Sequence, residues 1–143
     1  PEQKSRIVQE AHRLLEPGGR YGIHELCLIP DDLDENTKME IQNELSTVIH
    51  HGTRPLTIAE WQGLLDAEGF SVQTQVQTPM HLLEPRRLIQ DEGMLGALRF
   101  AFNLLCNGEA RRRVLAMRRV FSKYRDHLAA VMIVGQKKEK VPQ

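Results

Sequence analysis

Apolar residues near the N-terminus recur at the spacing of one side of an α-helix. These residues are Ile7, Val8, Ala11, Leu14 and Leu15. Positions i, i+1, i+4, i+7 and i+8 lie along a single stripe of a helix. Pro17 disfavours the helical conformation at Glu16, and Gly18 and Gly19 accept the positive φ angles of a helix end. The pattern therefore predicts a helix that ends in a tight turn.

A mostly apolar segment, residues 21–28, follows this turn. Pro30 and Asp31 bound it on the far side. A run of this length and composition is typical of a strand, and of a largely covered strand rather than a half-exposed hairpin arm. A helix, a tight turn and a covered strand in this order indicate an α/β fold.

A second helix is predicted from about residue 34 to residue 50, after a polar cluster at 30–36 whose acidic residues suit a helix start. The residues predicted on its buried side are Ile41, Leu45, Val48 and Ile49. Thr57 and Glu60 then have the spacing of a capping box, with Leu56 and Trp61 at the two positions of a hydrophobic staple. They predict a third helix, which ends near Gly69.

Alternating residues from Phe70 to Val76 predict a strand with one polar face. Beyond it, a short helix begins at Pro85, and Gly93 separates it from a second helix with one apolar side. The residues of that side are Met94, Leu95, Leu98, Ala101, Phe102 and Leu105. Asn107 and Gly108 precede a last helix predicted to run through Leu128. A compact β-branched run, residues 129–135, predicts the final strand.

Two of these segments carry a family resemblance. Residues 15–20, Leu-Glu-Pro-Gly-Gly-Arg, and the strand that follows resemble the passage from the fourth helix to the fifth strand of class I S-adenosylmethionine-dependent methyltransferases. Residues 57–72, from Thr57 to Val72, are similar to the family's next helix and strand, commonly L-T-x-x-E-W-x-x-L-L-x-x-A-G-F. The resemblance implies a Rossmann-like sheet that binds S-adenosylmethionine.

The resemblance covers only the C-terminal half of that family. Its members hold the cofactor on a glycine-rich loop after the first strand, and no G-x-G-x-G occurs in these 143 residues. We therefore interpret residues 1–143 as a single partial domain, a fragment whose cofactor-binding residues are expected upstream of residue 1. The run 129–135 then corresponds to the family's closing strand, antiparallel between the fifth and sixth strands. Segments 30–56 and 84–127 are predicted as inserted cap or lid helices.

Candidate site residues follow from this placement, because ligands of open α/β sheets bind beyond the carboxyl ends of the strands. Glu25 stands where the resemblance implies an acidic residue on the fifth strand, and a carboxylate can orient or deprotonate a methyl acceptor. His24 is adjacent, and on a regular strand it points to the opposite face. The alternative for Glu25 is a strand carboxylate satisfied by the backbone or by Arg20.

A second group of candidates, His50, His51 and Arg54, follows the helix predicted at 34–50. A helix end followed by glycine and arginine suits a loop that closes over a ligand, in which histidine serves as a base or a substrate contact. The alternative is an exposed loop that only ends the helix. Adjacent histidines cannot both reach one metal from a regular helix, and no third ligand is suitably spaced, so no metal site is predicted.

Basic residues concentrate on the helix predicted at 109–127. Arg111, Arg118 and Arg125 recur every seven residues, beside an apolar stripe. Such a side suits anionic lipid headgroups or nucleic acid. Because the whole chain has a formal net charge of zero, we favour a solvated face paired with acids such as Glu109 and Asp126.

Composition is that of an ordinary globular protein, with 41% hydrophobic and 27% charged residues. No run of about 18 apolar residues suggests a membrane span. Cys27 and Cys106 lack the spacing of a metal or redox motif, and we interpret them as two buried, reduced thiols of a cytoplasmic protein.

Two functions remain open. The first is methyl transfer from S-adenosylmethionine to a small or lipid-like acceptor, by a longer chain of which this fragment alone is inactive. The alternative is a non-catalytic binding module that uses the basic helix 109–127 to contact a protein or an anionic surface. Nucleic acid is not an expected partner. Because the edge of strand 21–28 and the stripe of the first helix would lack cover, the isolated chain is expected to self-associate.

Overall fold

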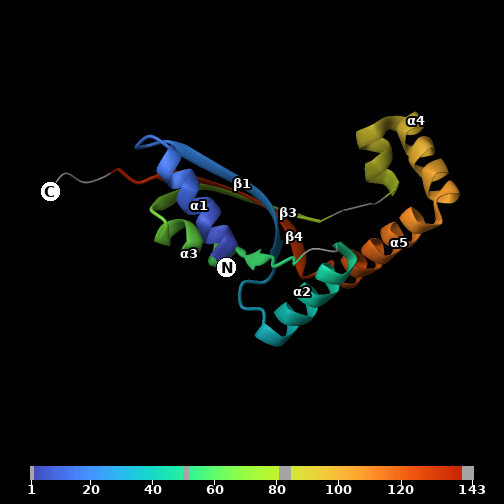
Figure 1. Cartoon of the computed structure of the whole chain (residues 1–143), viewed down its shortest axis with the longest axis horizontal. Coiled ribbons are helices and arrows are strands. Elements are labelled where there is room, and N and C mark those ends of the chain that lie inside the picture. The colour runs from blue at the N-terminus through green and yellow to red at the C-terminus, as the bar shows by residue number, and fades with distance from the viewer. Residues whose placement is uncertain (1, 50–51, 81–84, 140–143) are drawn as a thin grey trace. The chain divides into compact units, whose positions relative to one another are not determined.

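The computed structural model describes residues 2–49, 52–80 and 85–139 of the chain. They form two compact units (Figure 1). The first, here called the sheet unit, comprises Pro1–Leu33, Pro55–Thr78 and Ala129–Gln143. The second, the helical unit, comprises Asp34–Arg54 and Pro79–Leu128. We describe each unit by itself.

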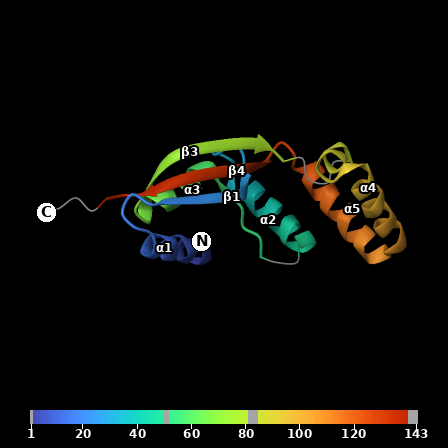
Figure 2. The same ribbon diagram turned by 90° about the horizontal axis from the view of Figure 1, so that it is seen from above.

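The sheet unit contains four strands and two helices. In chain order they are α1 (Glu2–Leu14), β1 (Arg20–Leu28), β2 (Leu56–Thr57), α3 (Ile58–Ala67), β3 (Phe70–Pro79) and β4 (Leu128–Lys137). The strand order is β2-β1-β4-β3, and Figure 2 shows β4 between β1 and β3.

Strand β4 runs antiparallel to its two neighbours. The last residue of β4, Lys137, accepts from the N–H of Gly18 at 3.2 Å and donates to the carbonyl of Gly19 at 2.8 Å, just before β1 begins. The N–H of Lys138 likewise bonds the carbonyl of Gly69, just before β3 begins, at 2.9 Å. These contacts confirm the predicted placement of the final strand between the two preceding ones.

Helix α3 begins as its sequence predicts. The Thr57 side chain accepts from the N–H of Glu60 at 3.2 Å, and the Glu60 carboxylate accepts from the N–H of Thr57 at 2.7 Å, which completes the capping box. The helix ends before Gly69, whose φ of +84° favours glycine. A Cβ at this position would lie 2.8 Å from the ring of His12 in α1, so α1 also restricts the residue.

The core of the sheet unit lies on one face of the sheet, where both helices pack (Figure 1). Val8 of α1 and Trp61 and Leu65 of α3 belong to one buried cluster with strand residues. Those strand residues are Ile23, Cys27, Phe70, Ala129, Val131 and Ile133. Residues that alternate with them point to the other face, and Met132 is 44% exposed there. Among the described residues of the sheet unit, no helix packs on this second face.

The expectation that strand 21–28 is largely covered is wrong for this chain. Gly22, His24 and Glu25 are exposed. Among the described residues, only β2 pairs with the outer edge of β1, in the parallel register Cys27 to Leu56 and Leu28 to Thr57. The remaining edge and one face of β1 have no neighbour in the described part of the chain.

The helical unit contains α2 (Glu35–Ile49), α4 (Pro85–Cys106) and α5 (Gly108–Lys123). Gly93 has φ 72° and ψ 174° and divides α4 into two helical segments, as predicted. The Asn107 side chain caps α5 by accepting from two backbone N–H groups, at 3.0 and 3.1 Å. Helix α5 ends at Lys123, and Leu128 opens β4, so the predicted extension of this helix through Leu128 is wrong.

The two cysteines differ in exposure. Cys27 is fully buried in the sheet unit, whereas Cys106 is exposed at the end of α4. The expectation of two buried thiols is therefore wrong for Cys106. Burial raises the pKa of the Cys27 thiol to about 11, and the nearby Asp31 carboxylate adds to this.

We expect the native chain to release one equivalent of thiolate product with an aromatic disulfide reagent at pH 8, and two equivalents after denaturation. The thiolate is the reactive form, and with a pKa of about 11 only about one thousandth of Cys27 is ionised at that pH. A Cys106→Ser variant should release none in the native state. Rapid release of two equivalents from the native chain would contradict the burial of Cys27.

None of the described helices is both long and apolar enough to cross a membrane.

Candidate functional site

The two strand candidates lie at a single depression on β1. Its volume is about 230 Å³. His24 and Glu25 both line it, together with Lys4, Ile7, Val8, Tyr21, Gly22, Ile23 and Trp61. The depression runs along the part of the β1 edge that β2 does not pair with.

Lys4 of α1 is the cation at this depression. Its ammonium lies 3.6 Å from a carboxylate oxygen of Glu25 and 4.6 Å from the ring centroid of Trp61. Lys4, and not Arg20, therefore pairs with Glu25. The Glu25 side chain is 45% exposed, so this ion pair contributes little to stability.

Two aromatic residues complete the depression. Burial raises the pKa of the Tyr21 hydroxyl, and the Glu25 carboxylate adds to the increase. Trp61 is 3% exposed, and its indole N–H has no hydrogen-bond partner among the described residues. A buried donor without a partner is costly, so an acceptor that reached this N–H would stabilise the unit.

The other predicted candidates do not add to this group. His50 and His51 lie outside the described residues, and Arg54 is exposed in the helical unit. Within the described ranges, no three His, Cys, Asp or Glu side chains gather as metal ligands would. The depression offers a carboxylate, an imidazole and an ammonium, which can bind a polar group or accept a proton.

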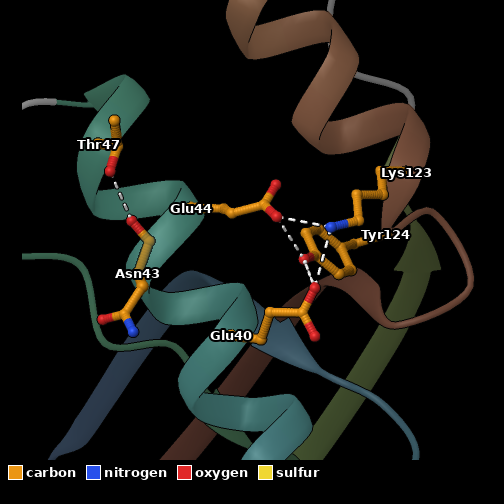
Figure 3. Close-up of polar contacts among 6 residues, drawn as sticks. All are labelled: Glu40, Asn43, Glu44, Thr47, Lys123 and Tyr124. Atoms are coloured by element: carbon orange, nitrogen blue, oxygen red, sulfur yellow. Dashed lines mark hydrogen bonds and ion pairs between the residues drawn. The ribbon is translucent and has the colours of Figure 1, made fainter.

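A polar cluster that the sequence did not predict joins α2 to α5 in the helical unit (Figure 3). The Lys123 ammonium donates to Glu40 at 2.9 Å and to Glu44 at 2.5 Å. The Tyr124 hydroxyl lies 2.7 and 2.9 Å from the same two carboxylate oxygens. Each of the four side chains has a partner within the cluster, so we interpret it as a structural link between the two helices.

This cluster shifts the pKa values of its members. Hydrogen bonds from Lys123 and Tyr124 lower the pKa of the Glu40 and Glu44 carboxyls below 4.5, and the carboxylates raise the pKa of Lys123 above 10.5. Burial raises the pKa of Tyr124 to about 12. The folded state thus favours charged Glu40, Glu44 and Lys123 and a neutral Tyr124.

We expect Lys123→Met to reduce the stability of the helical unit only within a window of pH. The carboxylates contribute stability above their ordinary pKa of 4.5, and this is lost as pH falls through their lowered values. Lys123 contributes below its ordinary pKa of 10.5, and this is lost as pH rises above it. Urea unfolding of both proteins, followed by helical circular dichroism, should show a difference at pH 7 that decreases as the pH falls below the ordinary carboxyl pKa of 4.5. A difference independent of pH would contradict the ionic interpretation.

An apolar groove lies between α4 and α5 in the helical unit. Its volume is about 340 Å³. Its lining consists of Ile89, Met94, Ala97, Leu98, Phe100, Ala101, Leu104, Val114, Leu115 and Arg118. The sequence indicated an apolar side for residues 94–105, but not that α5 would leave a groove beside it.

Comparison with known proteins shows what this arrangement is similar to. No family model matches the chain. An uncharacterized protein of Haemophilus influenzae is 27% identical over 136 residues, which are 95% of this chain and 52% of that protein. The chain thus spans about half the length of this curated relative.

Solved structures match over nearly the whole chain. The cyclopropane synthase MmaA2 of Mycobacterium tuberculosis has a TM-score of 0.67 at 15% identity, covering 95% of this chain and 50% of that one. A putative sarcosine dimethylglycine methyltransferase of Galdieria sulphuraria has a TM-score of 0.62 at 16% identity, with coverages of 96% and 49%. A SAM-dependent methyltransferase of Thiobacillus denitrificans, in complex with S-adenosylhomocysteine, has a TM-score of 0.57 at 14% identity, with coverages of 94% and 52%.

The chain has the fold of about half of a class I S-adenosylmethionine-dependent methyltransferase, consistent with the C-terminal half.

Proposed function

We propose that this chain is the C-terminal half of an S-adenosylmethionine-dependent methyltransferase that acts on a small or lipid-like acceptor. The observation that supports it best is the sheet, in which one face and most of the outer β1 edge have no neighbour among the described residues. In the proposed enzyme, a preceding half supplies the strand beside β1 and the helices on that face. The relatives, which are about twice as long, support this proposal.

The described residues do not by themselves fit the cofactor. They contain no glycine-rich loop of the kind that cradles it, and the depression on β1 is an uncovered strand edge. A neighbouring strand would pair with this edge and could supply an acceptor to the buried Trp61 N–H. We therefore propose that the cofactor-binding residues lie in the preceding half; two of the similar solved structures are complexes with S-adenosylhomocysteine, which supports the choice of cofactor.

Acceptor binding is the role proposed for this half. The ligand crevice of such sheets lies beyond the carboxyl ends of the strands, where β1 leads into the loop that begins at Ile29. Helices α2, α4 and α5 are proposed as the cap beside that crevice. Glu25 and His24, with His50, His51 and Arg54, stay the predicted acceptor contacts, although the ion pair with Lys4 also gives Glu25 a structural role. A cytoplasmic location likewise stays a prediction.

The test is calorimetry with S-adenosylhomocysteine on two proteins. One is the chain of residues 1–143, and the other is the product of the complete reading frame that contains it. We expect micromolar binding by the longer protein and none by the shorter one. Micromolar binding by residues 1–143 alone would show that the cofactor site is misplaced.

The alternative, a non-catalytic binding module, predicts a different result. A complete reading frame without a strand followed by G-x-G-x-G, whose product does not bind S-adenosylhomocysteine, would favour the module. The same calorimetric titration thus separates the two functions.

A further inference from the structure

Charge is unevenly distributed along this neutral chain. The segment Pro85–Lys123, which forms α4 and α5, contains nine Lys and Arg residues and three Asp and Glu residues. Its formal net charge is +6, so the remainder of the chain carries −6. The basic residues are thus concentrated on one helix pair.

Most arginines of α5 are not neutralised locally. Arg111, Arg112, Arg113, Arg118 and Arg119 have no ion pair with any described acidic residue. Of the acids expected to pair with this face, only Asp126 does so, with Arg125 at 3.7 Å. The five arginines therefore present uncompensated positive charge.

These arginines adjoin apolar surface. Arg111, Val114, Leu115 and Arg118 follow the i, i+3, i+4, i+7 spacing of one side of α5. Val114, Leu115 and Arg118 line the apolar groove. The two apolar groove residues of α5 are thus bracketed by cations within the same side of the helix.

Helix α4 adds exposed apolar side chains beside this groove, whose lining includes Met94 and Leu98. Leu95, Leu98, Phe102 and Leu105 recur at i, i+3, i+7 and i+10 on one side of the helix, and their exposed fractions range from 60% to 84%. Met94 adds to them at 64%. Together with the groove and with Arg111, Arg112, Arg118 and Arg119, these side chains make up what we call the α4–α5 surface.

We propose that the α4–α5 surface binds the face of a lipid bilayer that contains anionic lipids. Arginines beside exposed Leu and Phe are what an interfacial helix needs, because the apolar side chains enter the acyl boundary while the guanidinium groups bond phosphates. The charge of the helix pair is complementary to anionic headgroups, which attract about 1 kcal/mol per basic residue. This docking needs no cofactor and so does not depend on the proposed methyltransferase activity.

The experiment is cosedimentation of the full-length protein with vesicles. One set is phosphatidylcholine alone, and the other is phosphatidylcholine mixed with phosphatidylglycerol. We expect binding to the mixed vesicles only, and we expect it to weaken strongly as salt approaches about 1 M, where the Debye length falls to about 3 Å. Equal binding to both vesicles, or no binding to either, would overturn the proposal.

Matched variants separate specific docking from general charge. Arg112→Gln with Arg119→Gln should weaken binding about 25-fold, since the attraction per arginine corresponds to about fivefold in affinity. The control, Arg6→Gln with Arg20→Gln, removes the same charge from exposed positions of the sheet unit and should leave affinity unchanged. An equal loss in both variants would overturn the assignment to α5.

The apolar side has its own pair of variants. Leu95→Gln with Phe102→Gln should abolish most binding at low salt, whereas Met39→Gln, at a 54% exposed position of α2, should not. All these positions are exposed, so circular dichroism should be unchanged. If the Leu95 and Phe102 variant instead converts an oligomer to a monomer and vesicles are never bound, the surface is an interface between copies and the proposal is wrong. If every variant still binds S-adenosylhomocysteine, the loss of vesicle binding is independent of cofactor binding.

Discussion

Replacing Phe70 with alanine is expected to lower the free energy of unfolding of the sheet unit by about 3–5 kcal/mol. Phe70 is fully buried at the start of β3. Its ring lies 5.3 Å from the ring of His12 and 5.7 Å from that of Tyr21, measured between centroids. It also packs against the backbone of Gly135, where an added Cβ would lie 3.2 Å from the Phe70 Cβ. One side chain thus joins α1, β1, β3 and β4.

The measurement is urea unfolding followed by tryptophan fluorescence. Trp61 is the only tryptophan of the chain and is buried in the sheet unit, so its emission reports that unit. The control is Val76→Ala, at a 49% exposed position of the same strand, with an expected loss below about 0.5 kcal/mol. If Phe70→Ala does not fold, Phe70→Leu should still show a loss of about 1–2 kcal/mol. Equal losses in Phe70→Leu and Val76→Ala would contradict the central position of Phe70.

Local features of the fold were predictable because their causes are local. The capping box of α3 needs only Thr57 and Glu60, three residues apart, and the break in α4 needs only Gly93. The position of β4 between β1 and β3 depends on distant pairing, and it was predictable only through resemblance to a family with that strand order.

Burial was predicted less well because it depends on what covers each face. The composition of β1 suits a covered strand, yet His24 and Glu25 are exposed, at an edge that no described strand pairs with. Cys106 ends α4, and the apolar side chains of this helix that precede it are themselves exposed. An apolar pattern identifies a surface that favours burial, but it does not identify the partner that buries it.

The sequence could suggest single candidate residues of the site, but not the residues that other helices bring beside them. Resemblance proposed Glu25 as a candidate, and the structure places Lys4 of α1 and Trp61 of α3 beside it, at sequence distances where no spacing rule applies. The link from Lys123 to Glu40 and Glu44 spans about 80 residues and leaves no local signal. Such contacts become visible only once the helices are placed.

We expect the isolated chain of residues 1–143 to self-associate through the sheet unit. Ile7 and Leu14 of α1 are 60% and 68% exposed, and β2 covers the outer edge of β1 only at Cys27 and Leu28. An unpaired strand edge beside exposed apolar side chains is a template for pairing with another chain. Sedimentation velocity should therefore show a mass that rises with protein concentration.

A lysine at Gly22 is the change that should suppress this association. Gly22 lies on the exposed edge of β1, where an added Cβ would meet no atom within 4 Å, and a charge on a strand edge opposes pairing. Gly63→Lys is the matched control, because it adds the same side chain on α3 at a position that is equally open. We expect Gly22→Lys to shift the chain to monomer and Gly63→Lys to leave it associated. A monodisperse monomer of the unaltered chain at high concentration would contradict the interpretation of β1 as an uncovered edge, and with it the strongest structural support for a missing half.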